Sequence, residues 1–210
     1  MAMACLDLYE TTYDPVWFRK GLELSNEIKR LFRNGNGPFY DTGIDGEVLL
    51  TRNAEGYDGV EPSGNSSVAN AFLRLNSYGL ESEFFEDAQR IFRCFSPMFN
   101  QAGVSFCSML SGLHFSLSGP KEVVISGRRG DAETEALLSE VRREFHPNTV
   151  TAFLEDGNSK LTEEIIPLTS GRPMLNGRAT AYVCQNQACR LPVHTVEELR
   201  ELLSSSYFQN

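Results

Sequence analysis

The sequence predicts a mainly helical protein that ends in a small α/β part. Two observations indicate this fold class. Through residues 1–119, apolar side chains recur at spacings of three and four, which is the period of an amphipathic helix. From Lys121 onward, short β-branched runs alternate with helical stretches, which is typical of strands joined by crossover helices. We therefore expect two domains, 1–119 and 120–210.

Composition narrows the function classes. The 210 residues carry a net charge of −9, so a general nucleic-acid binder is not expected, because such proteins neutralise phosphates with a basic patch. No apolar run approaches the ~20 residues that span a bilayer, and the start of the chain lacks the basic segment of a signal peptide. The five cysteines have no regular spacing. We expect a reducing, cytoplasmic location and no cofactor.

The helical part begins with a segment that has the pattern of a helix interior, with Ala4, Cys5 and Leu8 on one side. Asp14 and Pro15 then form a helix start signal. Apolar residues at helical spacing follow at Trp17, Gly21, Leu24, Ile28 and Leu31. Further helices are predicted over 65–78, 84–98 and 106–117, and short extended pieces over 39–41 and 47–52.

The α/β part is predicted to contain three strands in one small parallel sheet. The strands are expected over 122–127, 149–154 and 180–184. Helices are expected after Asp131, over 161–166 and after Thr195, where Thr195 and Glu198 match a capping box.

Polar residues gather where the helix at 65–78 begins. The run from Tyr57 to Asn70 contains two carboxylates, a proline and two glycines, and then the N-cap candidates Ser63, Asn65 and Ser66. Free backbone N–H groups and the positive end of the helix dipole make such a junction a place for a polar ligand. The alternative is a well-capped helix after a turn.

Two other segments show weaker sequence signals of a functional site. Cys184 and Cys189 are separated by four residues, which fits neither a thioredoxin-type dithiol nor, without two more ligands, a zinc site. A reduced pair at a strand end is the simpler expectation, with redox or metal use as the alternative. The loop at Gly127–Gly130 lacks the full dinucleotide and Walker patterns, so a nucleotide site there is a minor alternative.

Several segments in series carry a family resemblance. They are Asp7 to Glu10 with Asp14 and Pro15, the run Tyr57 to Ser66, Lys121 to Ile125, Pro147 to Val150, and Ala181 to Cys184 with Asn186, Cys189, Pro192 and Val193. Together and in this order they resemble the C-terminal region of the spermatogenesis-associated protein 20 family, a YyaL-like, thioredoxin-domain-containing family. The resemblance covers nearly the whole chain.

That resemblance implies an architecture. Members carry an N-terminal thioredoxin-like domain followed by an (α/α)₆-type toroid of helical hairpins, similar to the toroids of sugar epimerases and six-hairpin glycosidases. The present chain would supply a partial toroid and is expected to be a fragment or truncated form. Its partners would be a small sugar and the upstream thioredoxin-like domain. Because a partial toroid exposes apolar faces, self-association is also expected.

The resemblance also suggests site residues at the toroid mouth. Asp58 and Glu61 are the candidate catalytic carboxylates, and the candidate substrate-binding residues are Arg52, Tyr57, Ser63, Asn65 and Ser66. Sugar epimerisation needs a general acid and base, and hydrolysis needs two carboxylates that flank the bond. No histidine lies near the junction in the sequence. Two function classes follow: a carbohydrate epimerase, isomerase or hydrolase that is inactive as this fragment, or a non-catalytic scaffold for the thioredoxin-like domain.

Overall fold

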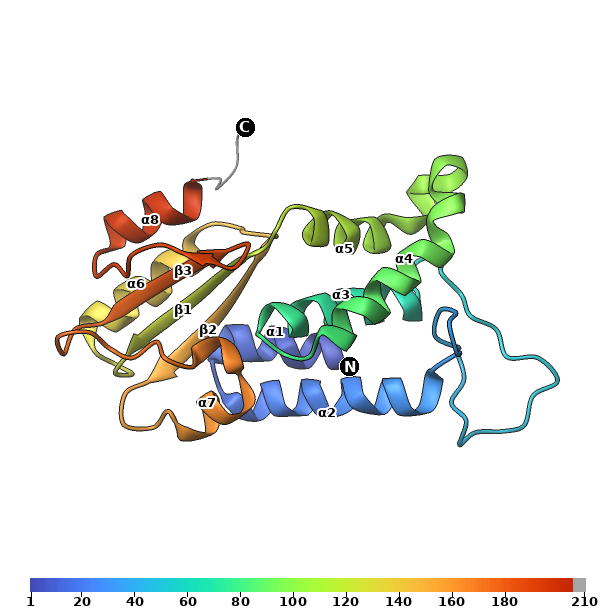
Figure 1. The fold of residues 1–210 in the computed structure, drawn as a ribbon, viewed down its shortest axis with the longest axis horizontal. Helices are drawn as coiled ribbons and strands as arrows, with labels where there is room; N and C mark the ends of the chain where they lie inside the picture. Colours follow the sequence, from blue (N-terminus) through green and yellow to red (C-terminus); the bar gives the residue numbers. More distant parts are fainter. Residues whose placement is uncertain (206–210) are drawn as a thin grey trace. The chain divides into compact units, whose positions relative to one another are not determined.

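The computed structural model describes residues 1–205 (Figure 1). The chain forms two compact units. The first comprises residues 1–76 and 80–117, and the second comprises residues 77–79 and the chain from Ser118 onward. Among the described residues, no helix combines the length and apolar character that a membrane span requires.

The first unit is helical, as the sequence predicts. Its elements are α1 (Ala2–Thr12), α2 (Pro15–Phe32), α3 (Gly64–Ser77), α4 (Ser82–Ala102), a 3₁₀ turn η1 (Gly103–Phe106) and α5 (Cys107–Leu117). The predicted extended pieces at 39–41 and 47–52 are wrong, because residues 33–63 contain no helix or strand (Figure 1). Whether these helices belong to a toroid of hairpins stays a prediction.

Local capping explains where the helices begin. The Asp14 carboxylate accepts a hydrogen bond from Val16 N at 3.0 Å, with Pro15 in the first turn, as predicted. The apolar stripe predicted for α1 is wrong by one position. Leu6 and Tyr9 are buried while Leu8 is exposed, because Leu6 packs against Gly21 of α2, which has no side chain to obstruct it.

Aromatic rings and a buried ion pair hold the helical unit together. The Phe72 ring of α3 lies edge-on to Phe39 and Phe84, with centroids 5.7 and 4.9 Å away. Arg33, which directly follows α2, donates to the Asp87 carboxylate of α4 at 2.7 Å, and Asp87 is only 1% exposed. Phe39, which lies outside the helices, is therefore part of the core.

The second unit contains a sheet with helices against it. Its elements are β1 (Lys121–Gly127), α6 (Ala132–Arg143), β2 (Thr149–Glu155), α7 (Lys160–Ile165), a 3₁₀ turn η2 (Pro167–Thr169), β3 (Thr180–Gln185), β4 (Ala188–Cys189) and α8 (Val196–Ser204). The predicted capping box of α8 is confirmed, since Thr195 and Glu198 make both of its bonds.

The sheet corrects the predicted three-stranded parallel arrangement. It has four strands in the order β2-β1-β3-β4, and it is mixed. β2 pairs parallel to β1 through the α6 crossover, but β3 pairs antiparallel to β1. The link between β2 and β3 starts at Glu155, opposite Gly127, and ends at Thr180, opposite Ser126. This link therefore starts and ends at the same end of the sheet. As a result, β3 must run antiparallel to β1 and β2.

A two-residue turn adds the fourth strand. Asn186 and Gln187 both have positive φ angles, 51° and 64°, which is the conformation of a tight hairpin turn. Gln185 donates from its side chain to the carbonyls of Ser118 and Gly119. The hairpin is thus fixed both by its turn and by the segment before β1.

An ion-pair cluster joins α6 to α8. Glu140 is 5% exposed and accepts bonds from Arg200 Nε at 2.8 Å, Arg200 Nη2 at 2.9 Å and Arg143 Nε at 3.0 Å. The Arg200 hydrogen bond lowers the pKa of Glu140 from its ordinary 4.5 to about 2. Because the pKa in the folded state lies below that of the unfolded chain, this stabilisation is present above about pH 4.5 and is lost as pH falls toward 2.

Replacing Glu140 with glutamine should therefore destabilise the protein in a pH-dependent way. We expect Glu140→Gln to lower the free energy of unfolding at pH 7 by about 1–3 kcal/mol, since charge-assisted bonds are lost. The difference from wild type should shrink between pH 4.5 and 2. Urea unfolding at several pH values measures both effects, with Glu201→Gln, an exposed acid on α8, as control. A pH-independent difference would contradict the assignment.

Candidate functional site

The polar junction before α3 is built as a cap. Ser63 Oγ accepts a bond from Ser66 N at 3.1 Å and donates to Ser66 Oγ at 2.8 Å. Both serines are buried. These two predicted substrate-binding residues thus use their hydroxyl groups on each other and on the first turn of α3.

Asp58 anchors the loop to a second helix. Its Oδ1 accepts from Ser63 N at 2.9 Å, and its Oδ2 accepts from Ser108 N at 2.8 Å and Met109 N at 3.3 Å. The carboxylate therefore lies at the N-terminal end of α5, where the helix dipole favours a negative charge. Both oxygens are occupied by backbone donors, so Asp58 has a structural role.

Asn65 ties two distant points of the loop to α3. Its Nδ2 donates to the carbonyls of Phe39 and Glu55, both at 2.9 Å, and its Oδ1 accepts from Phe39 N at 2.8 Å. The side chain is 1% exposed. A buried amide with its donors and acceptor paired fixes the backbone that it binds.

Arg52 is held in the same way. Its Nη2 donates to Leu31 O at 3.4 Å and to the carbonyl of Thr42, and its guanidinium lies 4.1 Å from the centroid of the Tyr40 ring. The side chain thus links the end of α2 to the loop. Glu61 and Tyr57 are exposed at the surface.

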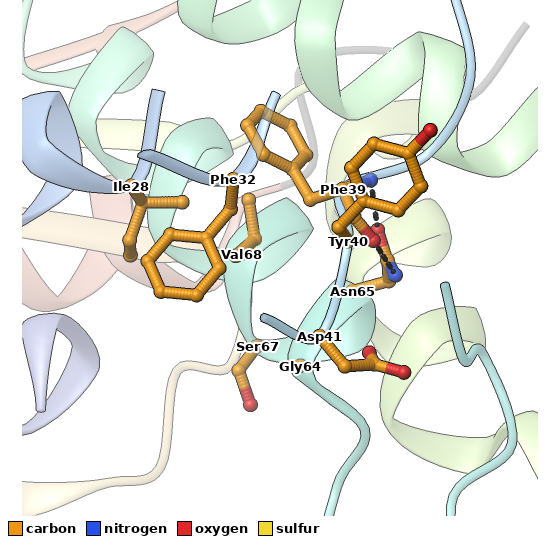
Figure 2. Close-up of a pocket in the computed structure, with 9 residues that line it drawn as sticks. All are labelled: Ile28, Phe32, Phe39, Tyr40, Asp41, Gly64, Asn65, Ser67 and Val68. Atoms are coloured by element: carbon orange, nitrogen blue, oxygen red, sulfur yellow. Dashed lines mark hydrogen bonds between the residues drawn. The ribbon is translucent and has the colours of Figure 1, made fainter. Parts of the chain in front are cut away.

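A cavity of about 400 Å³ lies beside the junction (Figure 2). Its lining combines apolar side chains with a few polar ones: Ile28, Phe32, Phe39, Tyr40, Asp41, Gly64, Asn65, Ser67 and Val68. Figure 2 shows the rings of Phe32, Phe39 and Tyr40 along one side and the polar groups of Asp41 and Ser67 along the other. Asn65 is the one predicted site residue that lines this cavity, and neither Asp58 nor Glu61 does.

Sequence reasoning missed most of this lining. The available signal is the succession Phe39, Tyr40 and Asp41 directly after a glycine–proline turn, a pattern that also predicts a short extended piece. In the structure Asp41 Oδ1 accepts from Glu55 N at 3.2 Å, so one carboxylate oxygen shapes the loop and Oδ2 has no described contact. The catalytic roles of Asp58 and Glu61 stay predictions, and the structure does not bring them together in this cavity.

The cavity can bind a small ligand with an apolar face and hydroxyl groups. Aromatic rings contact apolar faces, while a carboxylate and a hydroxyl orient polar groups. Its nine lining residues include one carboxylate and no histidine, cysteine, lysine or arginine. The lining therefore lacks a paired acid and base.

The structure also describes the two weaker candidate sites, the loop at Gly127–Gly130 and the cysteine pair. The loop at Gly127–Gly130 binds its own helix: Arg128 N donates to Thr134 Oγ1 at 3.1 Å, and Gly130 N donates to Glu135 Oε1 at 2.9 Å. Arg128 pairs with Asp156 at 2.9 Å. Backbone donors that a phosphate would need are thus engaged.

Cys184 and Cys189 form a disulfide, so the expected reduced pair is wrong in this structure. They are directly opposite each other on β3 and β4, an antiparallel register that the sequence could not give without the hairpin. Within residues 1–205, no group of three or more His, Cys, Asp or Glu side chains is arranged to hold a metal ion.

A substitution at Asp58 separates structural from chemical roles. We expect Asp58→Asn to lower the free energy of unfolding by about 1–3 kcal/mol, because an amide nitrogen cannot accept the bonds that Asp58 accepts. Glu61→Gln, at an exposed position in the same loop, should change it by less than about 0.5 kcal/mol. Denaturant unfolding of both variants measures this. Equal stability of the two variants would show that Asp58 does not anchor the loop.

The chain is similar in sequence to several curated proteins. No family model matches the sequence. The chain is 32% identical over 200 residues to human spermatogenesis-associated protein 20 and 31% identical to the mouse protein, covering 94% of this chain and 25% of each relative. An uncharacterised protein of Caenorhabditis elegans is 30% identical over 211 residues, which is 97% of this chain and 27% of that protein.

The chain therefore spans about a quarter of the length of the curated relatives it matches. The names of these relatives state no reaction or ligand. Over that quarter, this chain is similar to spermatogenesis-associated protein 20.

Proposed function

We propose that the chain provides a sugar-binding region of a larger, carbohydrate-active protein, and that it binds without completing the chemistry itself. The observation that supports this is the cavity beside α3, with aromatic rings on one side and Asp41 and Ser67 on the other. Sugar rings present apolar C–H faces and a rim of hydroxyl groups, so they match such a lining in both respects.

The size of the cavity supports the proposal. About 400 Å³ lies within the range of roughly 300–1,000 Å³ that is typical of small-molecule sites. Phe39 is pinned by Asn65, and Tyr40 is held beneath Arg52, so two of the rings are pre-positioned before a ligand arrives. Pre-positioned groups lose less entropy when a ligand binds.

The absence of a paired acid and base from the lining suggests where catalysis would come from. Glycoside hydrolysis needs two carboxylates, and sugar epimerisation needs an acid and a base. Asp41 supplies one carboxylate. In an epimerase, isomerase or glycosidase of the toroid type, the second group would come from outside these nine residues, with Glu61 as the exposed acid of the adjoining loop.

The second candidate function is a non-catalytic scaffold that partners a thioredoxin-like domain. The engagement of both Asp58 oxygens by backbone donors favours it, because three backbone hydrogen bonds hold the carboxylate in place as part of the loop. On this view the junction serves only to shape the loop.

A binding experiment tests the sugar proposal. We expect ligand-observed NMR and calorimetry on the full chain to detect a monosaccharide or disaccharide from a panel. Tyr40→Ala and Ser67→Val should each weaken that binding at least about fivefold, through loss of ring contact and loss of a hydroxyl.

A control variant accompanies it. Tyr57→Ala removes an aromatic ring that is 56% exposed and outside the cavity. It should leave the affinity unchanged. The proposal would be overturned if no sugar in the panel binds, or if Tyr40→Ala and Tyr57→Ala lower the affinity equally. The non-catalytic scaffold would then be the remaining candidate function.

A further inference from the structure

The disulfide in the second unit has an unusual set of neighbours. Cys184 is 1% exposed on β3, whereas Cys189 on β4 is exposed. Arg172 Nη2 lies 3.5 Å from Cys184 Sγ and 3.7 Å from Cys189 Sγ. One cation thus contacts both sulfurs of a bond that has one buried end and one accessible end.

The position of Arg172 is fixed by several contacts. Its Nη1 donates to the carbonyl of Leu168, and its own backbone carbonyl accepts from Ser126 Oγ of β1. The next carbonyl, that of Pro173, accepts from Tyr182 Oη of β3. Two adjacent strands therefore hold this segment against the sheet, and the guanidinium is directed at the sulfurs before any reaction begins.

A purely structural role explains these contacts poorly. The stabilisation that a disulfide provides grows with the length of chain it closes, and this bond joins residues only five apart. The hairpin already has its own turn at Asn186 and Gln187, and Gln185 is bound to the segment before β1. A neutral disulfide also has no need of a cation, whereas a thiolate does.

We propose that Cys184 and Cys189 form a reversible thiol–disulfide exchange site that reacts with external thiols at Cys189. The proposal does not depend on the sugar-binding function, since the site lies wholly in the second unit.

The reaction balances as follows. An external thiolate attacks Cys189 Sγ, a new disulfide forms between them, and the Cys184–Cys189 bond breaks. The electron pair leaves on Cys184 as a thiolate beside Arg172. A second external thiolate then attacks the external sulfur of the mixed disulfide and releases Cys189 as a thiolate. The external thiols are oxidised to their disulfide, and the two protons that they lose are taken up by Cys184 and Cys189.

The surroundings favour Cys184 as the leaving group. Because Cys184 is buried, an unassisted thiolate there would be unfavourable, and the Arg172 guanidinium offsets that cost. Glu122 pairs with Cys184 across the β1–β3 ladder, so their side chains share one face of the sheet. Burial raises the pKa of the Glu122 carboxyl, and the nearby charge of Arg172 opposes that shift.

Exchange with glutathione tests the proposal on the full chain. Cys94 and Cys107 are free and exposed, so both are first replaced with serine to remove their background reaction. Reduced glutathione is added to the oxidised protein, and intact-mass and peptide-mapping mass spectrometry follow the products. We expect a mixed disulfide on Cys189 and not on Cys184. Arg172→Gln should slow its formation about tenfold, because the leaving thiolate loses its cation.

Arg190→Gln is the matched control, since it removes an exposed arginine that directly follows Cys189, the last residue of β4. It should slow the reaction less than about twofold, as expected for a screened surface charge. Arg172→Lys, which keeps the charge, should retain more of the rate than Arg172→Gln, and circular dichroism confirms that each variant is folded.

Three results would overturn the proposal. The first is no Cys184–Cys189 bond in air-oxidised protein. The second is a mixed disulfide on Cys184. The third is equal slowing by Arg172→Gln and Arg190→Gln, which would show that general surface charge and not the placed guanidinium governs the rate.

Discussion

The side-chain amide of Asn65 is the constraint on which the helical unit most depends. Residues 33–63 form a long connection without helix or strand, and such a segment must find partners for its backbone groups elsewhere. Asn65 supplies three of them at once, two at Phe39 and one at Glu55. Asn65 lies in the first turn of α3, a rigid element. Its bonds therefore fix both halves of the loop, at Phe39 and at Glu55, relative to this helix.

The cavity follows from that constraint. Phe39 packs in the core against Phe72. The next residues, Tyr40 and Asp41, therefore line the cavity together with residues of α2. Asp58 and Arg52 fix the rest of the connection at α5 and at the end of α2. The polar residues that resemble a catalytic set thus act as anchors, and the aromatic residues beside them are held in fixed positions.

The sequence predicted the helices well, since these depend on neighbours three or four positions away, although Asp131, the expected cap of α6, makes no side-chain bond to that helix. Asp14 and the Thr195 capping box fall where local rules place them. The sequence could not reveal what depends on distant contacts. The antiparallel direction of β3 depends on where a loop returns, the Cys184–Cys189 bond depends on hairpin register, and the role of Asn65 depends on Phe39, 26 positions earlier. The family resemblance implied ligand-binding or catalytic roles for Asn65 and Asp58, which stay predictions, whereas their bonds to the backbone depend on contacts that the sequence does not show.

Hydrogen–deuterium exchange at the Phe39 amide tests the central claim most directly. If Asn65 holds the loop, Asn65→Ala should remove the protection of that amide while the amides of the β1 and β2 strands keep theirs. Asn70→Ala is the matched control, because Asn70 lies on the same helix but bonds to Ser66 and Ser108 instead. The account predicts fast exchange at Phe39 in the first variant and slow exchange in the second. Slow exchange at Phe39 in both would contradict it.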